Sequence, residues 1–208
     1  HHALRVTAAE ADQGYRWAVD MDLAKFFDTV NHSRLIRKLS LKIKDGRVIS
    51  LIHKMLRSGV QINGETKPTE IGLMQGGPLS PLLANIYLDE LDKELEKRGH
   101  RFARYADDLI CICKSRRAAE RTLASLTRFV QDKMLLKVNQ EKSHVSLVTS
   151  SRTKFLGYGF YFSQAKGEVR LTIHKKSKQK LKDTIRQLLT RNPRTSIENV
   201  KQLLAQKL

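Results

Sequence analysis

The stretch Phe102–Cys113 constrains the fold of this chain more than any other. It places two adjacent aspartates, Asp107 and Asp108, directly before an unbroken apolar run. The run predicts a strand buried on both faces, and the aspartates predict a tight turn that joins it to a preceding strand. Two carboxylates about 4 Å apart repel by roughly 4 kcal/mol at an effective dielectric of 20. The turn therefore needs positive charge, and a hard divalent cation that prefers oxygen ligands meets this need.

A second group of acids lies near the start of the chain. Residues 15–23 predict a strand that ends in acid, and alternation places Asp20 and Asp22 on one of its faces. If this strand pairs antiparallel with the apolar run, Asp22 meets Asp107 and Asp108. Asp20 is the competing candidate for the place of Asp22, whereas Asp28 is expected to cap a helix rather than to bind metal.

The overall composition is that of a folded protein, with 40% hydrophobic and 29% charged residues among 208. No apolar run is long enough to cross a membrane and no signal-peptide pattern is present, so we expect neither a membrane span nor secretion. Cys111 and Cys113 lie two apart on the predicted strand, where a disulfide would be strained. They are expected to be reduced core cysteines of a cytosolic protein.

The net charge of +18 predicts a polyanionic partner, with nucleic acid favoured over a membrane surface. Part of this charge recurs at spacings of three and four along a predicted helix over 177–191, which places it on one ridge. The ridge residues are Lys175, Lys178, Lys182 and Arg186, and the apolar residues opposite them are Leu181, Ile185 and Leu188. We expect the ridge to contact phosphates; the alternative is an ordinary solvated helix face.

The remaining pattern alternates helices and strands. Apolar periodicity predicts helices that begin at caps Asp28 or Asn31, at Asp45 and at Ser115, and a long helix after the glycine-rich loop 75–81. The pair Asn63-Gly64 predicts a hairpin, and strands are expected at 136–138, 144–148 and 168–173, with a tight turn in 155–160. A last helix is expected over 196–207, opened by a capping box from Thr195 to Glu198.

Several of these segments resemble the motifs of reverse transcriptases. Tyr105-Ala106-Asp107-Asp108 resembles the YxDD motif, Asp22–Asp28 resembles the first palm motif, and Gln75–Pro81 resembles the next. The residues of these three motifs, together with those of segments 85–88 and 155–158, are most similar to the corresponding residues of reverse transcriptases encoded by bacterial group II introns. The resemblance covers roughly residues 15–163 and consists of four ordered motifs, which makes it highly specific.

The resemblance implies an α+β fold. We expect a ferredoxin-like polymerase palm, an antiparallel sheet with helices on one face, followed by C-terminal thumb helices. The palm would occupy residues 1–163, with a remnant of the preceding fingers segment at 1–14. The end of the palm and the start of a helical, basic thumb would occupy 164–208. On this basis we expect the chain to be a fragment of a longer polymerase.

The resemblance also implies a catalytic site for RNA-directed DNA synthesis. Asp22, Asp107 and Asp108, with the backbone carbonyl of Leu23, would hold two Mg²⁺ ions. Lys142 would protonate the pyrophosphate; the alternative is an ordinary surface lysine. Three further residues would contact the incoming dNTP: Phe27 as a steric gate against the 2′-hydroxyl, and Gln75 and Gly76 in the glycine-rich loop.

A third set of residues would contact nucleic acid. Gly77 would allow close approach of the template, because it has no side chain. Phe155, Leu156, Gly157 and Tyr158 would form the primer-grip hairpin, and the ridge on the following helix would belong to the thumb. The implied partners are template and intron RNA, a DNA primer or target and dNTPs, in the bacterial cytoplasm, with no membrane and a possible homodimer.

Two other functions stay open at this stage. The protein could serve mainly as a maturase, a non-catalytic RNA-binding protein that assists intron splicing, which the basic excess favours. It could also be an RNA-dependent RNA polymerase with a similar palm, although Phe27 at the gate favours deoxynucleotides.

Overall fold

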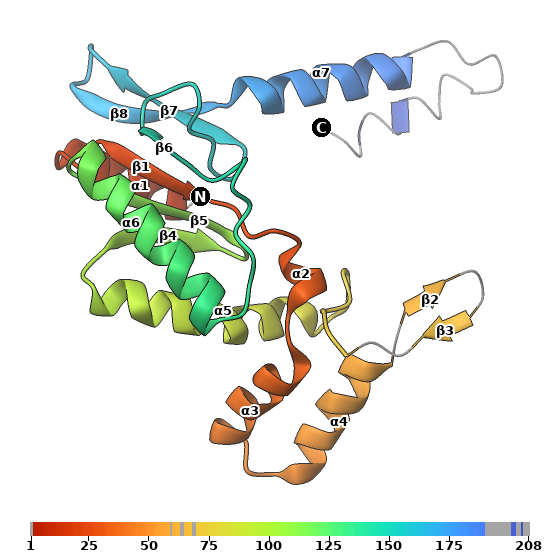
Figure 1. The fold of residues 1–208 in the computed structure, drawn as a ribbon. Helices are drawn as coiled ribbons and strands as arrows, with labels where there is room; N and C mark the ends of the chain where they lie inside the picture. The colour runs from red at the N-terminus through yellow and green to blue at the C-terminus, as the bar shows by residue number, and fades with distance from the viewer. Residues whose placement is uncertain are drawn as a thin grey trace.

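The computed structural model describes residues 2–58, 60–62, 65–67, 70–189, 201–202 and 205 of the chain. Its centre is a four-stranded sheet in the order β4-β5-β1-β6, in which every neighbouring pair is antiparallel (Figure 1). The strands are β1 (Trp17–Met21), β4 (Arg101–Tyr105), β5 (Asp108–Cys113) and β6 (His144–Leu147). The chain passes through helix α5 (Ser80–Lys97) between β1 and β4 and through helix α6 (Arg116–Arg128) between β5 and β6, which is the ferredoxin-like arrangement that the motifs imply. The expected pairing of the two central acidic strands is confirmed.

Two helices cover one face of this sheet. They are α5 (Ser80–Lys97) and α6 (Arg116–Arg128), and α6 continues into a π-helical turn over Phe129–Lys133. Buried Leu83, Tyr87 and Leu91 of α5 pack in the same core as Val19 and Cys111 of the sheet. Both cysteines are buried and free, as expected.

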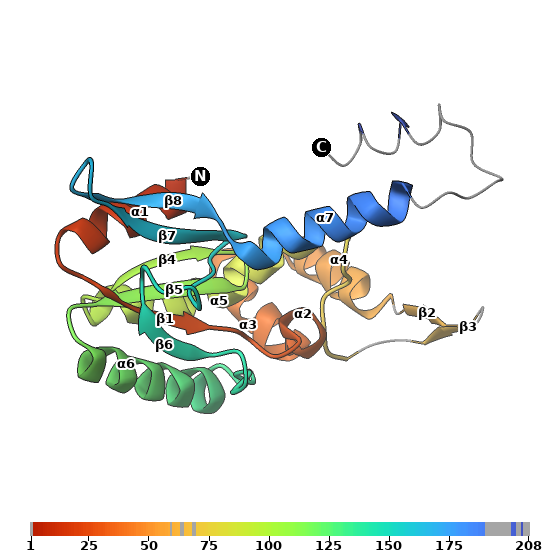
Figure 2. The same ribbon diagram turned by 90° about the horizontal axis from the view of Figure 1, so that it is seen from above.

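The opposite face of the sheet is covered as well, which the resemblance did not indicate. Helix α1 (His2–Asp12) and the hairpin of β7 (Tyr158–Ser163) and β8 (Glu168–Ile173) lie over it, as the view from above shows (Figure 2). Leu4 and Ala8 of α1 pack with Ile110 of β5 and Phe160 of β7 in a second core. The sheet is therefore buried on both faces, in agreement with the unbroken apolar run of β5.

A smaller helical part follows β1. It consists of α2 (Phe26–Thr29), α3 (His32–Lys42), α4 (Gly46–Arg57) and the paired strands β2 (Val60–Ile62) and β3 (Glu65–Lys67). The predicted Asn63-Gly64 turn between these strands lies outside the described residues. The side chain of Asn31 caps α3 by accepting a hydrogen bond from the Arg34 amide. Of the two predicted caps, Asn31 is therefore the one that caps this helix. Asp45 and Ser115 cap α4 and α6 as predicted.

Helix α7 (Lys175–Leu189) follows the β7–β8 hairpin and extends away from the four-stranded sheet (Figure 1). Its start is fixed by buried His174, whose ring bonds the Ser151 carbonyl at 3.0 Å, and by Ser177, whose hydroxyl donates to the Gly157 carbonyl at 2.8 Å. The predicted last helix falls mainly outside the described residues. Among those that are described, no helix has the length and apolarity needed to cross a bilayer.

The strand predicted over 136–138 is wrong. The only pairing there is a single bridge between Val138 and Leu23. The π-helical turn is followed by Leu135, whose φ of 58° interrupts an extended backbone immediately before the predicted strand. Leu136 and Val138 are buried in the core, so their apolar character reflects packing rather than a regular strand.

Candidate active site

The two adjacent aspartates lie at the turn between β4 and β5. Tyr105 pairs with Asp108 across the hairpin, so Ala106 and Asp107 form a two-residue turn. Ala106 has a φ of 54°, a conformation that residues with a Cβ rarely adopt. Asp107 thus lies in the turn itself, and Asp108 begins β5, where it is solvent-exposed. A regular strand would have sent the two carboxylates to opposite faces.

Asp22 joins these carboxylates from the neighbouring strand. Met21, the last residue of β1, pairs with Leu109, so Asp22, which follows the strand, lies beside Asp108, the first residue of β5. The pKa of Asp108 is raised, first because the surrounding chain partly desolvates its carboxyl and then because Asp107 and Asp22 repel its charge. The structure thus brings together the three acids that the sequence predicted.

Asp20, the competing candidate, faces the same region but is more enclosed. Its pKa is raised from 3.8 to about 6, chiefly by burial and further by Asp108 and Asp22, while His144 and Lys154 act in the opposite direction. It pairs with Ile110 and His144 inside the sheet, whereas Asp22 lies beyond the strand end. This placement favours Asp22 as a ligand and Asp20 as a neighbour that adds negative charge.

The carboxylates fit a hard divalent cation. Their donors are all oxygen, and after desolvation the mutual repulsion of Asp107, Asp22 and Asp108 contributes to the raised pKa of Asp108, a repulsion that a bound cation would relieve. Among the described residues, no three His, Cys, Asp or Glu side chains stand in a ready coordination geometry. The Leu23 peptide lies between two backbone bonds, from Ala24 to Lys137 and from Asn139 to Asp22, which fixes the position of the proposed carbonyl ligand.

A turn over residues 139–143 holds Asp22 from the other side. The Asn139 amide donates to the Asp22 carbonyl at 2.8 Å, and the Asp22 amide donates to the Ser143 hydroxyl at 3.0 Å. The Asn139 side chain in turn accepts from the amides of Glu141 and Lys142. This brings the Lys142 Nζ within 3.7 Å of an Asp22 carboxylate oxygen, with the lysine itself 70% exposed.

Arg104 was not among the predicted site residues. Its Nη1 donates to the Ala106 carbonyl in the turn at 2.7 Å and to Asn85 at 2.9 Å, and its Nε donates to Asp92 at 2.7 Å. A second bond from Nη2 makes the pair with Asp92 bidentate. The Arg104 side chain is only 11% exposed, and its guanidinium links the turn that carries Asp107 to α5. The signal in the sequence was an arginine two residues before the turn, facing an acidic helix.

Phe27 and Gln75 line one cavity of about 630 Å³, together with Met74 and Gly77. Phe27 lies in α2, five residues after Asp22, and is half-buried against Phe26 with ring centroids 5.3 Å apart. Gly76, with a φ of 82°, lies in the same loop but does not line the cavity. The predicted gate and the predicted nucleotide-binding glutamine thus face a common cavity, whose lining includes none of the three aspartates.

Gly72 was missed by the sequence reasoning, although it connects this loop to α2. It has a φ of 93°, and a Cβ there would come within 3.1 Å of the Phe27 carbonyl oxygen. Its amide donates to Val30 at 2.7 Å, and its carbonyl bonds the ring of buried His32 at 2.6 Å. Only glycine allows this close approach.

The predicted primer-grip hairpin forms a tight turn. Phe155 pairs with Tyr158, and both central residues, Leu156 and Gly157, have positive φ, which is the pattern of a type I′ turn. Phe155 is buried in the second core. All four ridge residues of α7 are exposed, and Arg186 forms an ion pair with Asp183 at 3.1 Å. The ridge lies on a different element from the carboxylates, and the start of that element, α7, is bonded to the Gly157 carbonyl.

Comparison with known proteins agrees with this geometry. The family described as reverse transcriptase (RNA-dependent DNA polymerase) matches residues 1–160. The group II intron-encoded protein LtrA of Lactococcus lactis subsp. cremoris is 32% identical over 204 residues, covering 88% of this chain and 34% of its own length. The retron Mx65 reverse transcriptase of Myxococcus xanthus is 32% identical over 151 residues, covering 67% of this chain and 35% of its own.

The fold itself is shared with telomerase. The structure of apo telomerase from Candida tropicalis superposes with a TM-score of 0.64 at 15% identity, covering 85% of this chain and 36% of that one. This chain spans about a third of the length of the curated relatives named above. The matched family and the arrangement of β1, β5 and their acids lead to one conclusion: the chain belongs to the reverse transcriptase family, and within it resembles the proteins that group II introns encode.

Proposed function

We propose that this protein is an RNA-directed DNA polymerase of the group II intron type, which transfers nucleotides from dNTPs to a primer 3′-hydroxyl on an RNA template. One observation carries the proposal: Asp22 and the Asp107–Asp108 turn meet at the ends of paired strands. The family match supports it, as does the net charge of +18, which suits a nucleic-acid substrate.

The roles of the residues follow from their places. Asp22, Asp107 and Asp108, with the Leu23 carbonyl, would hold two Mg²⁺ ions. Bound Mg²⁺ supplies activation of the attacking hydroxyl and neutralisation of the leaving pyrophosphate. Lys142, exposed beside Asp22, would hold a proton at Nζ for that pyrophosphate. The ring of Phe27 would exclude a 2′-hydroxyl, and Gln75 would contact the nucleotide from the other side of the cavity.

Primer extension tests this proposal. The protein at full length should extend a DNA primer on RNA with Mg²⁺ and dNTPs, and Asp107→Asn should abolish the extension. Unchanged synthesis by Asp107→Asn would rule out the metal site. Phe27→Ala should increase ribonucleotide incorporation, and an unchanged ratio of ribonucleotides to deoxynucleotides would remove the assignment of the gate.

A role as a maturase that binds intron RNA is the second candidate. The observation that favours it is the exposed ridge of α7, which leaves the sheet and lies on a different element from the carboxylates. A splicing assay separates the two roles: splicing assistance should survive Asp107→Asn and be lost when Lys178 and Lys182 are replaced by glutamate. Loss of splicing in Asp107→Asn alone would contradict a separate maturase function.

A further inference from the structure

A concave basic surface lies at the end of the sheet opposite the carboxylates. It is a hollow of about 520 Å³ between α6 and the start of β4, which we call the rear hollow, and its polar lining includes Tyr15, His100, Arg101, Lys114, Arg121 and Ser125. Among the described residues that line it, none is an acid. A concave site of this kind suits an anion that enters it.

Two cations of the rear hollow, Arg101 and Lys114, lie over the ring of Tyr15. The Lys114 Nζ lies 5.2 Å and the Arg101 guanidinium 5.4 Å from the centroid of Tyr15. Such contacts hold a cation in place without neutralising it. Arg101 is also paired with Glu10 at 2.6 Å, so its charge is already balanced.

Two charges in the rear hollow have no acidic partner. Neither exposed Lys114 nor exposed Arg121 forms an ion pair with any described residue. Burial and the neighbouring Arg98 lower the pKa of His100, which disfavours its charged form, so the ring contributes hydrogen-bonding nitrogens rather than a third cation. Together these groups provide two cations and a polar lining for one bound anion.

The rear hollow is far from the candidate active site. Asp108 begins β5 and Lys114 follows its end, so the six residues of the strand separate them by roughly 20 Å. Tyr15 likewise precedes β1, whereas Asp22 follows it. An anion bound here therefore belongs to a part of the ligand that does not lie on the carboxylates.

We propose that the rear hollow binds a backbone phosphate of nucleic acid, from an RNA segment outside the template–primer, through Lys114 and Arg121. A phosphate matches two unpaired cations and hydrogen-bond donors in a concave site. A flat anionic membrane surface would not enter it. This second contact would hold RNA on the back of the protein while the other end of the sheet stays free for synthesis.

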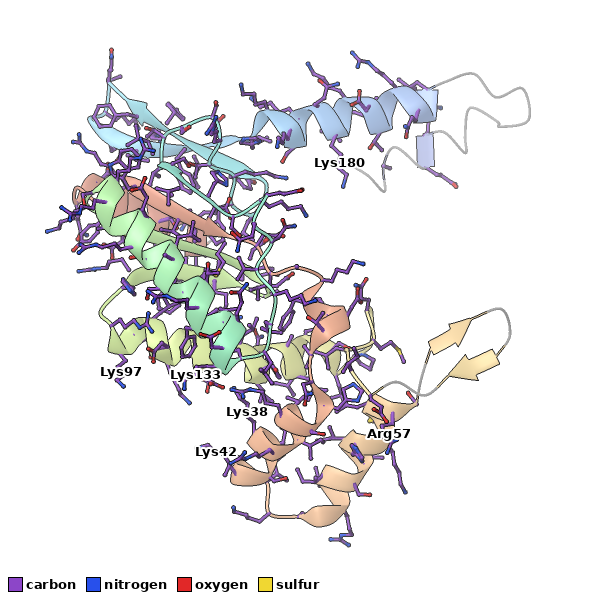
Figure 3. All side chains as sticks on the ribbon, in the orientation of Figure 1. Lys38, Lys42, Arg57, Lys97, Lys133 and Lys180 are labelled. Atoms are coloured by element: carbon purple, nitrogen blue, oxygen red, sulfur yellow. The ribbon has the colours of Figure 1, made fainter. Side chains whose placement is uncertain are left out.

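Basic side chains lie on many other elements, so the test needs a matched control. Lys38 and Lys42 on α3, Lys97 on α5, Lys133 after α6 and Lys180 on α7 are examples (Figure 3). Arg117 is the closest match to Arg121: it is exposed on the same helix, one turn away, and does not line the rear hollow.

The experiment measures fluorescence anisotropy of a blunt RNA hairpin, which offers no primer end, against the wild type, Lys114→Glu, Arg121→Glu and Arg117→Glu. We expect each of the first two variants to bind about tenfold more weakly at 0.1 M salt. Each should also reduce the slope of log affinity against log salt by about one. Arg117→Glu should stay within about twofold of the wild type. Lys114→Gln and Arg121→Gln, with melting temperatures measured alongside, separate loss of charge from loss of fold.

Equal weakening by Arg117→Glu, or none in the two rear-hollow variants, would overturn the proposal. The same variants are also measured with two further ligands, a DNA hairpin of the same sequence and a free nucleoside triphosphate. Rear-hollow variants that weaken triphosphate binding but not hairpin binding would also overturn it. The hairpin assay needs no polymerisation, so its failure is distinct from failure of the primer-extension test.

Discussion

At the scale of single residues, Arg104 links the carboxylate turn to the rest of the fold. Ala106 holds a positive φ that alanine rarely adopts, and a bond from Arg104 to its carbonyl helps keep it there. The arginine is itself positioned by Asp92 and Asn85 on α5. The spacing between Asp107 and Asp22 therefore depends on a side chain that touches neither of them.

Replacing Arg104 by lysine should loosen this turn while keeping the charge. Lysine cannot form the bidentate pair with Asp92 and also reach the Ala106 carbonyl. We expect unfolding to require about 2 kcal/mol less, primer extension to fall about tenfold and the Mg²⁺ concentration for half activity to rise. Arg116→Lys, in an exposed ion pair with Glu120, is the control and should change none of these quantities. An unaltered Mg²⁺ dependence in Arg104→Lys would show that the turn is held without it.

Asp20 should make stability depend on pH. Because its pKa of about 6 lies above the unfolded value of 3.8, the folded protein keeps a proton that the unfolded chain has lost. Stability is therefore lost as pH rises from about 4 to 6, and the cost persists above that range. In EDTA, Asp20→Asn should be about 2 kcal/mol more stable than the wild type at pH 7 and no more stable at pH 4. Urea denaturation at both pH values measures this, and an equal difference at the two values would refute it.

At the scale of elements, local rules accounted for much of the fold. Asn31, Asp45 and Ser115 cap helices as short polar residues should, and strand 168–173 has the bounds that its pattern predicts. The place of the three acids also followed from strand ends and pairing. These features depend on neighbours in sequence or on one antiparallel pair, which is why a pattern is sufficient.

Other features depend on contacts that no local pattern contains. The apolar residues near Leu136 looked like a strand, but Leu135 breaks the extended backbone and packing explains their burial. Residues 1–14 were expected only as a remnant of the fingers segment, and the tertiary structure shows that Leu4 of α1 packs on the second face of the sheet. Arg104 and Gly72 were missed for the same reason, since their partners come from distant segments or from backbone geometry.

Gly72 offers a test of how the loop of Gln75 is joined to α2. Alanine there meets a positive φ and a carbonyl oxygen at 3.1 Å, so we expect a loss of about 2 kcal/mol in stability and poorer discrimination against ribonucleotides. Gly14→Ala is a matched control, because Gly14 has a φ of 92° with nothing within 4 Å of an added Cβ. It should lose less stability and keep its sugar selectivity. Equal effects in both variants would indicate that only the φ angle matters.

At the scale of the whole molecule, positive charge is spread over several surfaces, and its position matters more than its sum. The ridge of α7 and the rear hollow lie on different elements of the protein, and the carboxylates lie at a third place. An RNA segment that contacts the ridge therefore leaves the rear hollow available for another segment.

The ridge should contribute to binding through its own face. Lys178→Glu with Lys182→Glu should weaken binding of a primer–template duplex about tenfold at 0.1 M salt, and should reduce the salt slope by roughly two. Lys176→Glu with Lys180→Glu changes the same charge on the same helix, away from the ridge, and should have a smaller effect. A salt response that is identical in the two double variants would show that α7 attracts RNA only by its total charge.

The central position of β1 has a consequence for how the protein reaches its active form. Its partners β5 and β6 come from much later in the chain, and Asn139 and Ser143, which bind the Asp22 backbone, come later still than β5. Pairings between such distant segments form slowly. During synthesis on the ribosome, Asp22 therefore reaches its final position only after β6 has been made. A chain that is still incomplete would have no active centre with which to begin copying.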